Sequence, residues 1–172
     1  MSFLTQSMWT HGNSMHIEYP ECLDSVQRKD SGIRVQGKNG TTNLFHFAIP
    51  SSTIVDSEAM QLAAVFLRFR TASADTYIQE VYLYDGEERF AEFKQLNLAP
   101  EEFCTKRFDP PLYRMQYGLG VSIFAVFGEE PSSNIMEFSS AGGNFARNIN
   151  SNLPGKKSAK IVKNKKLQYR RR

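Results

Sequence analysis

Short runs of alternating apolar and polar residues, separated by turn residues, recur along most of the chain. Runs rich in Val, Ile, Phe and Tyr with turn signals between them are typical of β-strands. No long segment repeats its apolar residues with the 3.6-residue period of a helix. We therefore expect strands at Met15–Tyr19, Ile33–Gln36, Leu44–Ile49, Leu62–Arg70, Tyr77–Tyr84, Arg89–Lys94, Val121–Phe127 and Ile135–Phe138.

This pattern predicts an all-β fold, an antiparallel β-sandwich of jelly-roll-like arrangement with a basic C-terminal arm. The sandwich domain is expected at residues 1–147, and a linker with the arm at 148–172. Residues 56–64 predict either one helical turn or the lead into a strand. The segment 97–118 contains three prolines and predicts an ordered loop that crosses the sheet.

Two hairpins are expected from two-residue turns. Asp85-Gly86 is a favoured turn, and it would pair Tyr84 with Glu87. The core side of this hairpin would hold Val81, Leu83 and Phe90. Its other side would hold Tyr82, Tyr84 and Arg89.

The second expected turn is Gly12-Asn13, which would pair Thr10 with Met15. That register would place Trp9, His11, Ser14 and His16 together on one face.

Aromatic side chains on the outer face of a sandwich suggest a binding platform. Trp9, Tyr82 and Tyr84, with Arg89 over Tyr82 by cation–π attraction, could stack on a sugar or a base. The alternative is that the tyrosines are half buried, because Tyr favours strands.

The three histidines are the only candidate metal ligands, and they are weak ones. His11 and His16 would be diagonal neighbours on the expected hairpin, with His46 as a distant third ligand. The alternative is that His11 caps a turn and His16 stacks on Trp9. No cofactor is expected.

No residue pattern indicates catalysis, so we do not expect an enzyme. The chain has no Gly-x-Ser-x-Gly sequence, and neither Cys22 nor Cys104 lies in a recognisable protease context. The two cysteines are expected to be free, partly buried thiols, with a single disulfide as the alternative.

The charge of the chain is divided between two parts. Residues 155–172 carry nine of the 21 basic residues and no acidic residue, which leaves 12 basic and 18 acidic residues in 1–154. Such an arm is either a solvated tail or a binding segment for an anionic partner. Its cationic residues are Lys156, Lys157, Lys160, Lys163, Lys165, Lys166, Arg170, Arg171 and Arg172.

Three kinds of anionic partner are possible for the arm. Nucleic acid would bind in a strongly salt-dependent way. An anionic membrane is less favoured, because few apolar residues interrupt the charges. An acidic neighbour, including a second copy of this chain, is the third.

The chain has no apolar run of the ~20 residues that a membrane span needs. Its first residues have neither a basic segment nor a long apolar one, so a cytoplasmic location is expected. Export by a non-classical route is the alternative.

Five segments occur in an order that resembles a family of small bacterial β proteins of unknown function. They begin at Trp9-Thr-His-Gly-Asn, Phe45-His-Phe-Ala-Ile-Pro, Val81-Tyr-Leu-Tyr-Asp-Gly, Gly118-Leu-Gly-Val-Ser and Ser140-Ala-Gly-Gly-Asn-Phe. The resemblance covers about residues 8–145 and implies a single β domain, with the arm as an addition. It implies no catalytic residues.

These observations favour a non-enzymatic structural or interaction module that self-associates to a homo-oligomer, with its arm on an acidic neighbour. The first alternative is a nucleic-acid-binding protein that depends on the arm. The second is a carbohydrate-binding module that uses the aromatic platform.

Overall fold

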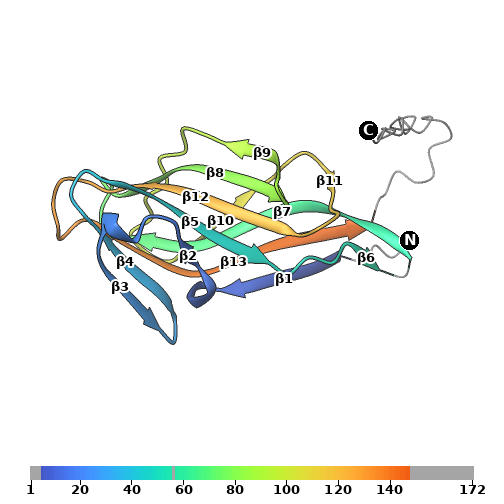
Figure 1. Ribbon diagram of the computed structural model, residues 1–172, viewed down its shortest axis with the longest axis horizontal. Helices are drawn as coiled ribbons and strands as arrows, with labels where there is room; N and C mark the ends of the chain where they lie inside the picture. Colours follow the sequence, from blue (N-terminus) through green and yellow to red (C-terminus); the bar gives the residue numbers. More distant parts are fainter. Residues whose placement is uncertain (1–4, 56, 148–172) are drawn as a thin grey trace, which may run out of the picture.

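The protein is a two-layered antiparallel β-sandwich. The computed structural model describes residues 5–55 and 57–147, most of which lie in strands (Figure 1). Every strand pair is antiparallel. The predicted sandwich is therefore confirmed. The linker and basic arm at 148–172 lie outside the described residues, so the division of the chain at 147 stays a prediction.

One layer is an eight-stranded sheet. Its main path runs β10-β7-β13-β4-β3, while β1 also pairs with β13, and β6 and β11 pair with β7. The strands are β1 (Thr5–His11), β3 (Leu23–Lys29), β4 (Gly32–Gly37), β6 (Ile54–Val55), β7 (Glu58–Thr71), β10 (Cys104–Phe108), β11 (Tyr113–Arg114) and β13 (Ile135–Arg147).

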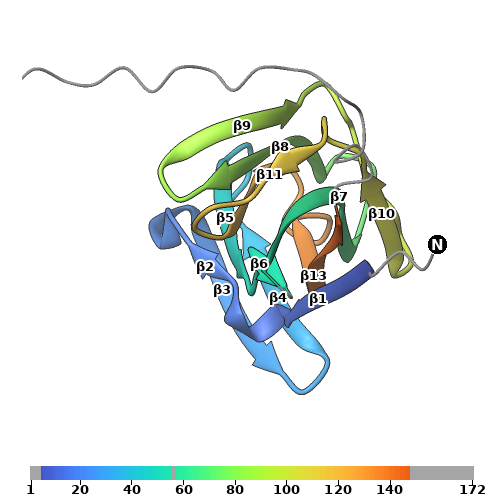
Figure 2. The ribbon, with the colours of Figure 1, turned by 90° about the vertical axis from the view of Figure 1, so that its right-hand side faces the viewer.

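The other layer is a five-stranded sheet of order β2-β5-β12-β8-β9. Figure 2 shows β8 and β9 on one side of the molecule and β1 and β13 on the other. The strands are β2 (His16–Ile17), β5 (Thr42–Ile49), β8 (Tyr77–Asp85), β9 (Glu88–Phe93) and β12 (Leu119–Val126). Two 3₁₀ turns, η1 (Gly12–Ser14) and η2 (Pro20–Cys22), lie among the first strands.

Phenylalanine side chains dominate the core between the sheets. Phe138 of β13 lies with its ring centre 5.4 Å from that of Phe45 on β5 and 6.0 Å from that of Phe69 on β7. All three rings are fully buried. Because side chains alternate along a strand, the burial of Phe45 and Phe47 places His46 and Ala48 on the outer face of β5.

The hairpin of β8 and β9 is present, but its register differs from the prediction. Asp85 pairs with Glu88, so Gly86 and Glu87 fill the turn in place of Asp85 and Gly86. The carboxylate of Asp85 is buried and accepts hydrogen bonds from another segment, which keeps this residue in the strand. A bulge beyond Leu83 restores the expected faces. Buried or packed against the core, as expected, are Val81, Leu83 and Phe90.

The hairpin expected around Gly12-Asn13 is wrong. β1 pairs with β13 over seven residues, and β2 pairs with β5 in the other sheet. The turn η1 carries the chain from one sheet to the other. Pairing with β13 satisfies more backbone groups than a four-residue hairpin would, so the long-range partner is preferred.

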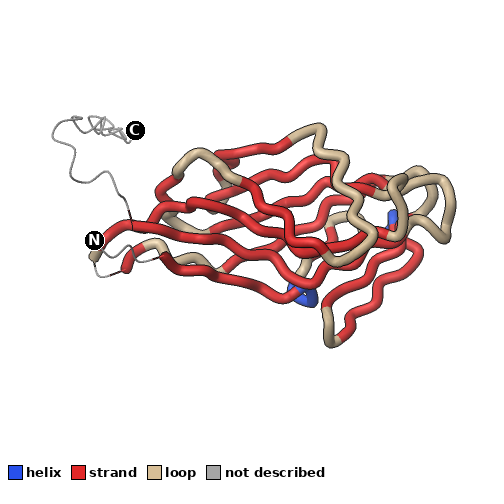
Figure 3. The backbone as a smooth tube through the Cα atoms, turned by 180° about the vertical axis from the view of Figure 1, so that it is seen from behind, coloured by secondary structure: helices blue, strands red, loops and turns tan. Residues whose placement is uncertain are grey.

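The segment 97–118 is a sheet edge rather than only a crossing loop. Its strands β10 and β11 both pair with β7. Glu58 begins β7, so residues 58–64 lie in a strand, in agreement with the second of the two alternatives. The strand expected to end at Phe138 continues to Arg147 (Figure 3).

Cys22 and Cys104 are free thiols in the structure, as expected. In the described part of the chain, the helical segments are short 3₁₀ turns, and none is long and apolar enough to cross a membrane.

Candidate functional site

The outer face of the five-stranded sheet has a shallow hollow where three strands carry small or widely spaced side chains. The pairing registers align Ala48 of β5 with Gly120 of β12, and Gly120 with Tyr84 of β8. Gly120 has no side chain, so the floor of the hollow is backbone. The hollow has a volume of about 340 Å³, and it also reaches His46 and Ser122.

A second tyrosine extends the hollow beyond the end of β12. Tyr117 is 75% exposed, and its ring lies over Gly86 in the β8–β9 turn. It lines a neighbouring depression that shares Ala48 and Gly120 with the first. The two tyrosines therefore stand on a continuous open surface with a floor of small residues.

The position of Tyr117 is fixed by a buried carboxylate. Asp85 accepts hydrogen bonds from the backbone N–H groups of Gln116 at 2.8 Å, Tyr117 at 2.8 Å and Gly118 at 2.9 Å. Hydrogen bonds to an ionised acceptor are about twice as strong as neutral ones. Asp85 thus fastens the loop that carries Tyr117 to the end of β8.

One wall of the hollow is a hydrogen-bonded chain of three polar side chains. His46 Nδ1 lies 2.8 Å from Ser122 Oγ, and His46 Nε2 lies 2.7 Å from Glu18 Oε2. A neutral ring that donates from Nε2 to the carboxylate accepts the serine hydroxyl at Nδ1. Hydrogen bonds, first from Tyr19 and then from His46, hold the pKa of the Glu18 carboxyl below its usual range.

The segment that carries Glu18 is anchored by a buried amide. Asn43 accepts a hydrogen bond from the Tyr19 N–H at 3.3 Å and donates one to the Tyr19 carbonyl at 2.7 Å. The Glu18 N–H also donates to the carbonyl of Leu44 at 3.0 Å. The orientation of His46 is therefore set from both of its ring nitrogens.

The order Ser122, His46, Glu18 resembles the nucleophile, base and orienting acid of acyl-transfer enzymes. Such an enzyme also needs N–H groups that bind the oxyanion. β12 pairs with β5 on one side and β8 on the other around Ser122, so its backbone N–H groups there are used by the sheet. The backbone of β12 beside Ser122 therefore offers no unpaired N–H group to an oxyanion.

Tyr82 lies next to this wall but offers little free ring surface. Its hydroxyl donates to the carboxylate of Glu80, and the guanidinium of Arg89 lies 5.2 Å from its ring centre. The hydrogen bond to Glu80 is the main cause that raises the pKa of Tyr82 to about 12. The cation–π contact is the one expected from the sequence, and it covers the ring.

The aromatic residues expected to form one platform lie on two faces of the molecule. Tyr82, Tyr84 and Arg89 belong to the five-stranded sheet, whereas Trp9 belongs to β1 in the eight-stranded sheet. Trp9 stacks on Phe66 there, with ring centres 5.5 Å apart, and not on His16.

The three histidines do not meet. His11 ends β1 and accepts the Asn13 N–H at 3.3 Å, whereas His16 and His46 pair across β2 and β5 with ring centres 6.3 Å apart. Over residues 5–55 and 57–147, no three His, Cys, Asp or Glu side chains are arranged to hold a metal ion. The nine basic residues predicted to bind an anionic partner, from Lys156 to Arg172, lie outside the described residues.

Several residues that form the hollow could not be predicted from the amino-acid sequence. Small side chains such as those of Ala48 and Gly120 carry no chemical signal, and they become a floor only through strand register. Tyr117 lies in the proline-rich segment, where an exposed aromatic beside Gly118 was a usable but weak signal. Glu18, in the bend after β2, and Ser122, in β12, carry no signal of their own, because only the fold brings them to His46.

The protein is thus a small antiparallel β-sandwich domain. The shallow hollow flanked by tyrosines on its outer face is a candidate binding surface. The chain belongs to a family of unknown function (DUF6623), whose sequence profile matches residues 3–142. The resemblance to an uncharacterised family is therefore confirmed. None of the curated proteins compared with the chain matches it.

Solved structures with similarity to this chain include three carbohydrate-binding modules. CBM86, a low-affinity xylan-binding module from Roseburia intestinalis, is 10% identical with a TM-score of 0.47, over 84% of this chain and 96% of that one. The CBM36-1 domain of a xylanase from the hindgut metagenome of Trinervitermes trinervoides is 11% identical with a TM-score of 0.43, over 80% and 96%. CBM29_1 from Piromyces equi is 11% identical with a TM-score of 0.40, over 80% and 90%. Likenesses of this degree say nothing about what the present chain binds.

Proposed function

We propose that the protein is a non-catalytic carbohydrate-binding module that uses the hollow on the five-stranded sheet. The observation that supports this most is the combination of a backbone floor at Gly120 with tyrosine rings at 84 and 117. A sugar ring has apolar C–H faces and a rim of hydroxyl groups. It can therefore pack flat on a tyrosine, whose ring face is electron-rich, while its rim reaches polar side chains.

The polar wall suits hydroxyl groups. His46 and Ser122 line the hollow, and the carboxylate of Glu18 stands behind the histidine at 2.7 Å. Ser122 donates its proton to His46, so a lone pair of its hydroxyl oxygen can accept a hydrogen bond from a sugar hydroxyl.

The absence of ionised side chains from the lining of this hollow, among the described residues, favours an uncharged ligand. The ligand class that fits is a neutral glycan, bound on an open surface rather than enclosed.

The test fills the floor of the hollow. In Gly120→Val the new Cβ would lie 3.4 Å from the Tyr84 Cβ, an ordinary contact, so the fold tolerates the change while the branched side chain occupies the ligand position. Calorimetric titration against a panel of soluble neutral polysaccharides should show binding by the wild type. Gly120→Val should lose at least tenfold in affinity, about 1.4 kcal/mol.

Truncation of an exposed ring gives an independent comparison. Tyr117→Ala should weaken binding, and Leu112→Ala is its matched control, because Leu112 is 62% exposed in the same segment and does not line the hollow. A wild-type protein that binds none of the neutral glycans, or a Gly120→Val protein that binds as the wild type does, would refute the proposal.

We also propose, as a second function, self-association through the arm. Its support is the charge of the sequence, with nine basic residues after Gly155 and an excess of acidic residues before it. Copies of the chain thereby offer one another surfaces of opposite charge.

A further inference from the structure

The outer face of the eight-stranded sheet carries its own aromatic platform. The registers align Trp9 of β1, Gly142 of β13, Phe66 of β7 and Arg107 of β10 in one row across four strands. The rings of Trp9 and Phe66 are 5.5 Å apart at 27°, so they lie nearly parallel. The Arg107 guanidinium lies 5.7 Å from the Phe66 ring centre.

Gly142 is the residue that lets the indole lie across the sheet. A Cβ at this position would be 2.5 Å from the Trp9 ring, a distance that real Cβ atoms do not adopt. Trp9 is nevertheless 45% exposed, so its ring rests on the sheet at Gly142 and is open to solvent on the outer side. A large apolar ring fixed in this way is a surface on which another flat ring can stack.

A line of arginines continues from this platform along β7. Arg68 and Arg70 follow Phe66 on the same face, at intervals of two residues or roughly 6.6 Å. Their guanidinium groups lie 5.7 and 5.1 Å from the ring centre of Phe103. The row from Phe66 to Arg70 is therefore roughly 13 Å long, and the rings hold its cations in place.

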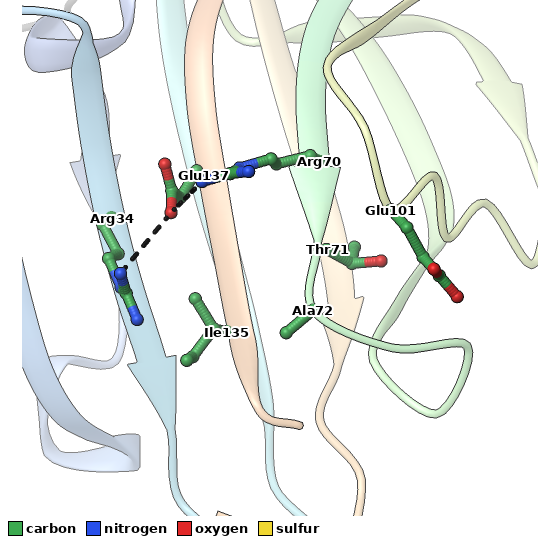
Figure 4. Close-up of a pocket in the computed structure, with 7 residues that line it drawn as sticks. All are labelled: Arg34, Arg70, Thr71, Ala72, Glu101, Ile135 and Glu137. Atoms are coloured by element: carbon green, nitrogen blue, oxygen red, sulfur yellow. Dashed lines mark hydrogen bonds and ion pairs between the residues drawn. The ribbon is translucent and has the colours of Figure 1, made fainter. Parts of the chain in front are cut away.

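The line ends at a hollow of about 290 Å³ (Figure 4). Glu137 of β13 stands between Arg34 of β4 and Arg70 of β7, with its carboxylate 3.7 Å from Arg34 and 3.0 Å from Arg70. One carboxylate is thus shared by two guanidinium groups. The Glu137 side chain is 13% exposed, so its carboxylate can be reached from the hollow.

Cations outnumber anions along this line. Arg107 pairs with Asp109 at 2.7 Å, and Arg34 and Arg70 share Glu137. Arg68 donates to Thr105 at 3.3 Å and forms no ion pair within the described part of the chain. With Glu101, which also lines the hollow, four guanidinium groups face three carboxylates, and Arg68 is the cation left for an anionic ligand.

We propose that this face is a second binding surface, which takes an acidic polysaccharide. Trp9, supported by the stacked ring of Phe66, would receive the face of a sugar ring, and Arg68 and Arg70 would receive the carboxylates of its uronic acid residues. Planar guanidinium groups match carboxylates in a bidentate geometry, which explains the use of arginine here. Both arginines contact Oε1 of Glu137, so its Oε2 can accept a hydrogen bond from a sugar hydroxyl, a donor that a DNA backbone does not have.

Trp9 gives a direct readout, because it is the only tryptophan of the chain. Titration of the full-length protein with polygalacturonate at low salt should shift or quench its fluorescence, and the effect should weaken with added NaCl. A neutral glycan that binds the opposite face should leave the fluorescence unchanged. Arg68→Ala should reduce the polygalacturonate affinity at least fivefold, and Arg68→Lys should restore only part of it.

Affinity electrophoresis in gels containing polygalacturonate is the second experiment. Trp9→Ala should be retarded clearly less than the wild type, with the remaining retardation due to the basic arm, whereas Tyr117→Ala should be retarded like the wild type. Failure of the neutral-glycan proposal would leave this pattern unaltered, since the two faces share no residue. An unchanged tryptophan signal with polygalacturonate, or equal retardation of Trp9→Ala and wild type, would overturn the proposal. Stronger retention by poly(dT) that also depends on Trp9 would overturn it in favour of nucleic acid.

Discussion

The pKa of the Tyr82 phenol depends on two neighbouring side chains. The hydrogen bond to the Glu80 carboxylate needs the phenol proton, so it disfavours the phenolate and raises the pKa of Tyr82 to about 12. The contact with Arg89 acts in the other direction, but it is the smaller effect. The pair of Glu80 and Arg89 leaves Tyr82 as part of the sheet surface, whereas Tyr84 remains open to the hollow.

This gives a prediction in alkaline solution. Because the folded pKa lies above the ordinary value of 10, the unfolded tyrosine ionises first, and the stabilising contribution of neutral Tyr82 is lost as pH rises from about 10 to about 12. Absorbance at 295 nm should show a late tyrosine step to which Tyr82 contributes; the pKa values of Tyr19 and Tyr113 are raised too. Glu80→Gln removes the charged acceptor, so this late step should move towards pH 10.

The control for that titration is Glu87→Gln in the nearby turn, which should leave the late step in place. An identical titration curve for Glu80→Gln and wild type would mean that Glu80 does not hold the phenol proton.

At the scale of elements, a loop and a strand are joined by Asp85. We expect Asp85→Asn to lower the free energy of unfolding by about 2–3 kcal/mol, because the amide NH₂ would face the Gln116 N–H and leave it without an acceptor. The same change should weaken glycan binding, since the loop that carries Tyr117 loses its anchor. Urea unfolding and calorimetric titration measure the two effects.

Asp24→Asn is the matched control for this substitution, because Asp24 is exposed on β3. It should change stability by less than about 0.5 kcal/mol. Equal stability of the two variants would show that Asp85 does not anchor the loop.

The elements also show which predictions a sequence allows. The β8–β9 hairpin is local, so its faces and the contact between Tyr82 and Arg89 could be predicted, although the register required knowledge of Asp85. β1 pairs with residues 129 to 141 positions further along the chain, and no short-range pattern indicates that pairing. The expected site with Trp9 beside Tyr82 was therefore split between two sheets. The hollow itself needs three distant strands in register, which explains why its floor was not foreseen.

At the scale of the whole molecule, the two outer faces differ in chemistry. The hollow near Gly120 is lined by uncharged groups, whereas the opposite face carries arginines beside Trp9. A sandwich keeps such faces apart because its core lies between them. Under the two glycan proposals made above, one domain would contact two different polymers at once without competition.

The arm contributes a prediction at this same scale. Light scattering after size-exclusion chromatography should show self-association of the full chain at low salt and a smaller species at high salt, because the attraction of opposite charges is screened. The protein without residues 148–172 should be monomeric at both salt concentrations. Monomers in every condition, for both proteins, would refute self-association through the arm.

The central place of β13 has a consequence for how the chain is made. A ribosome synthesises this strand after every other strand of the domain, yet β1, β4 and β7 all pair with it. Until β13 emerges, the edges of those three strands that it will join stay unpaired. Unpaired strand edges make a partly folded chain prone to aggregation. The eight-stranded sheet therefore closes in one late event, and premature termination a few residues before Ile135 would leave a polypeptide with no way to complete it.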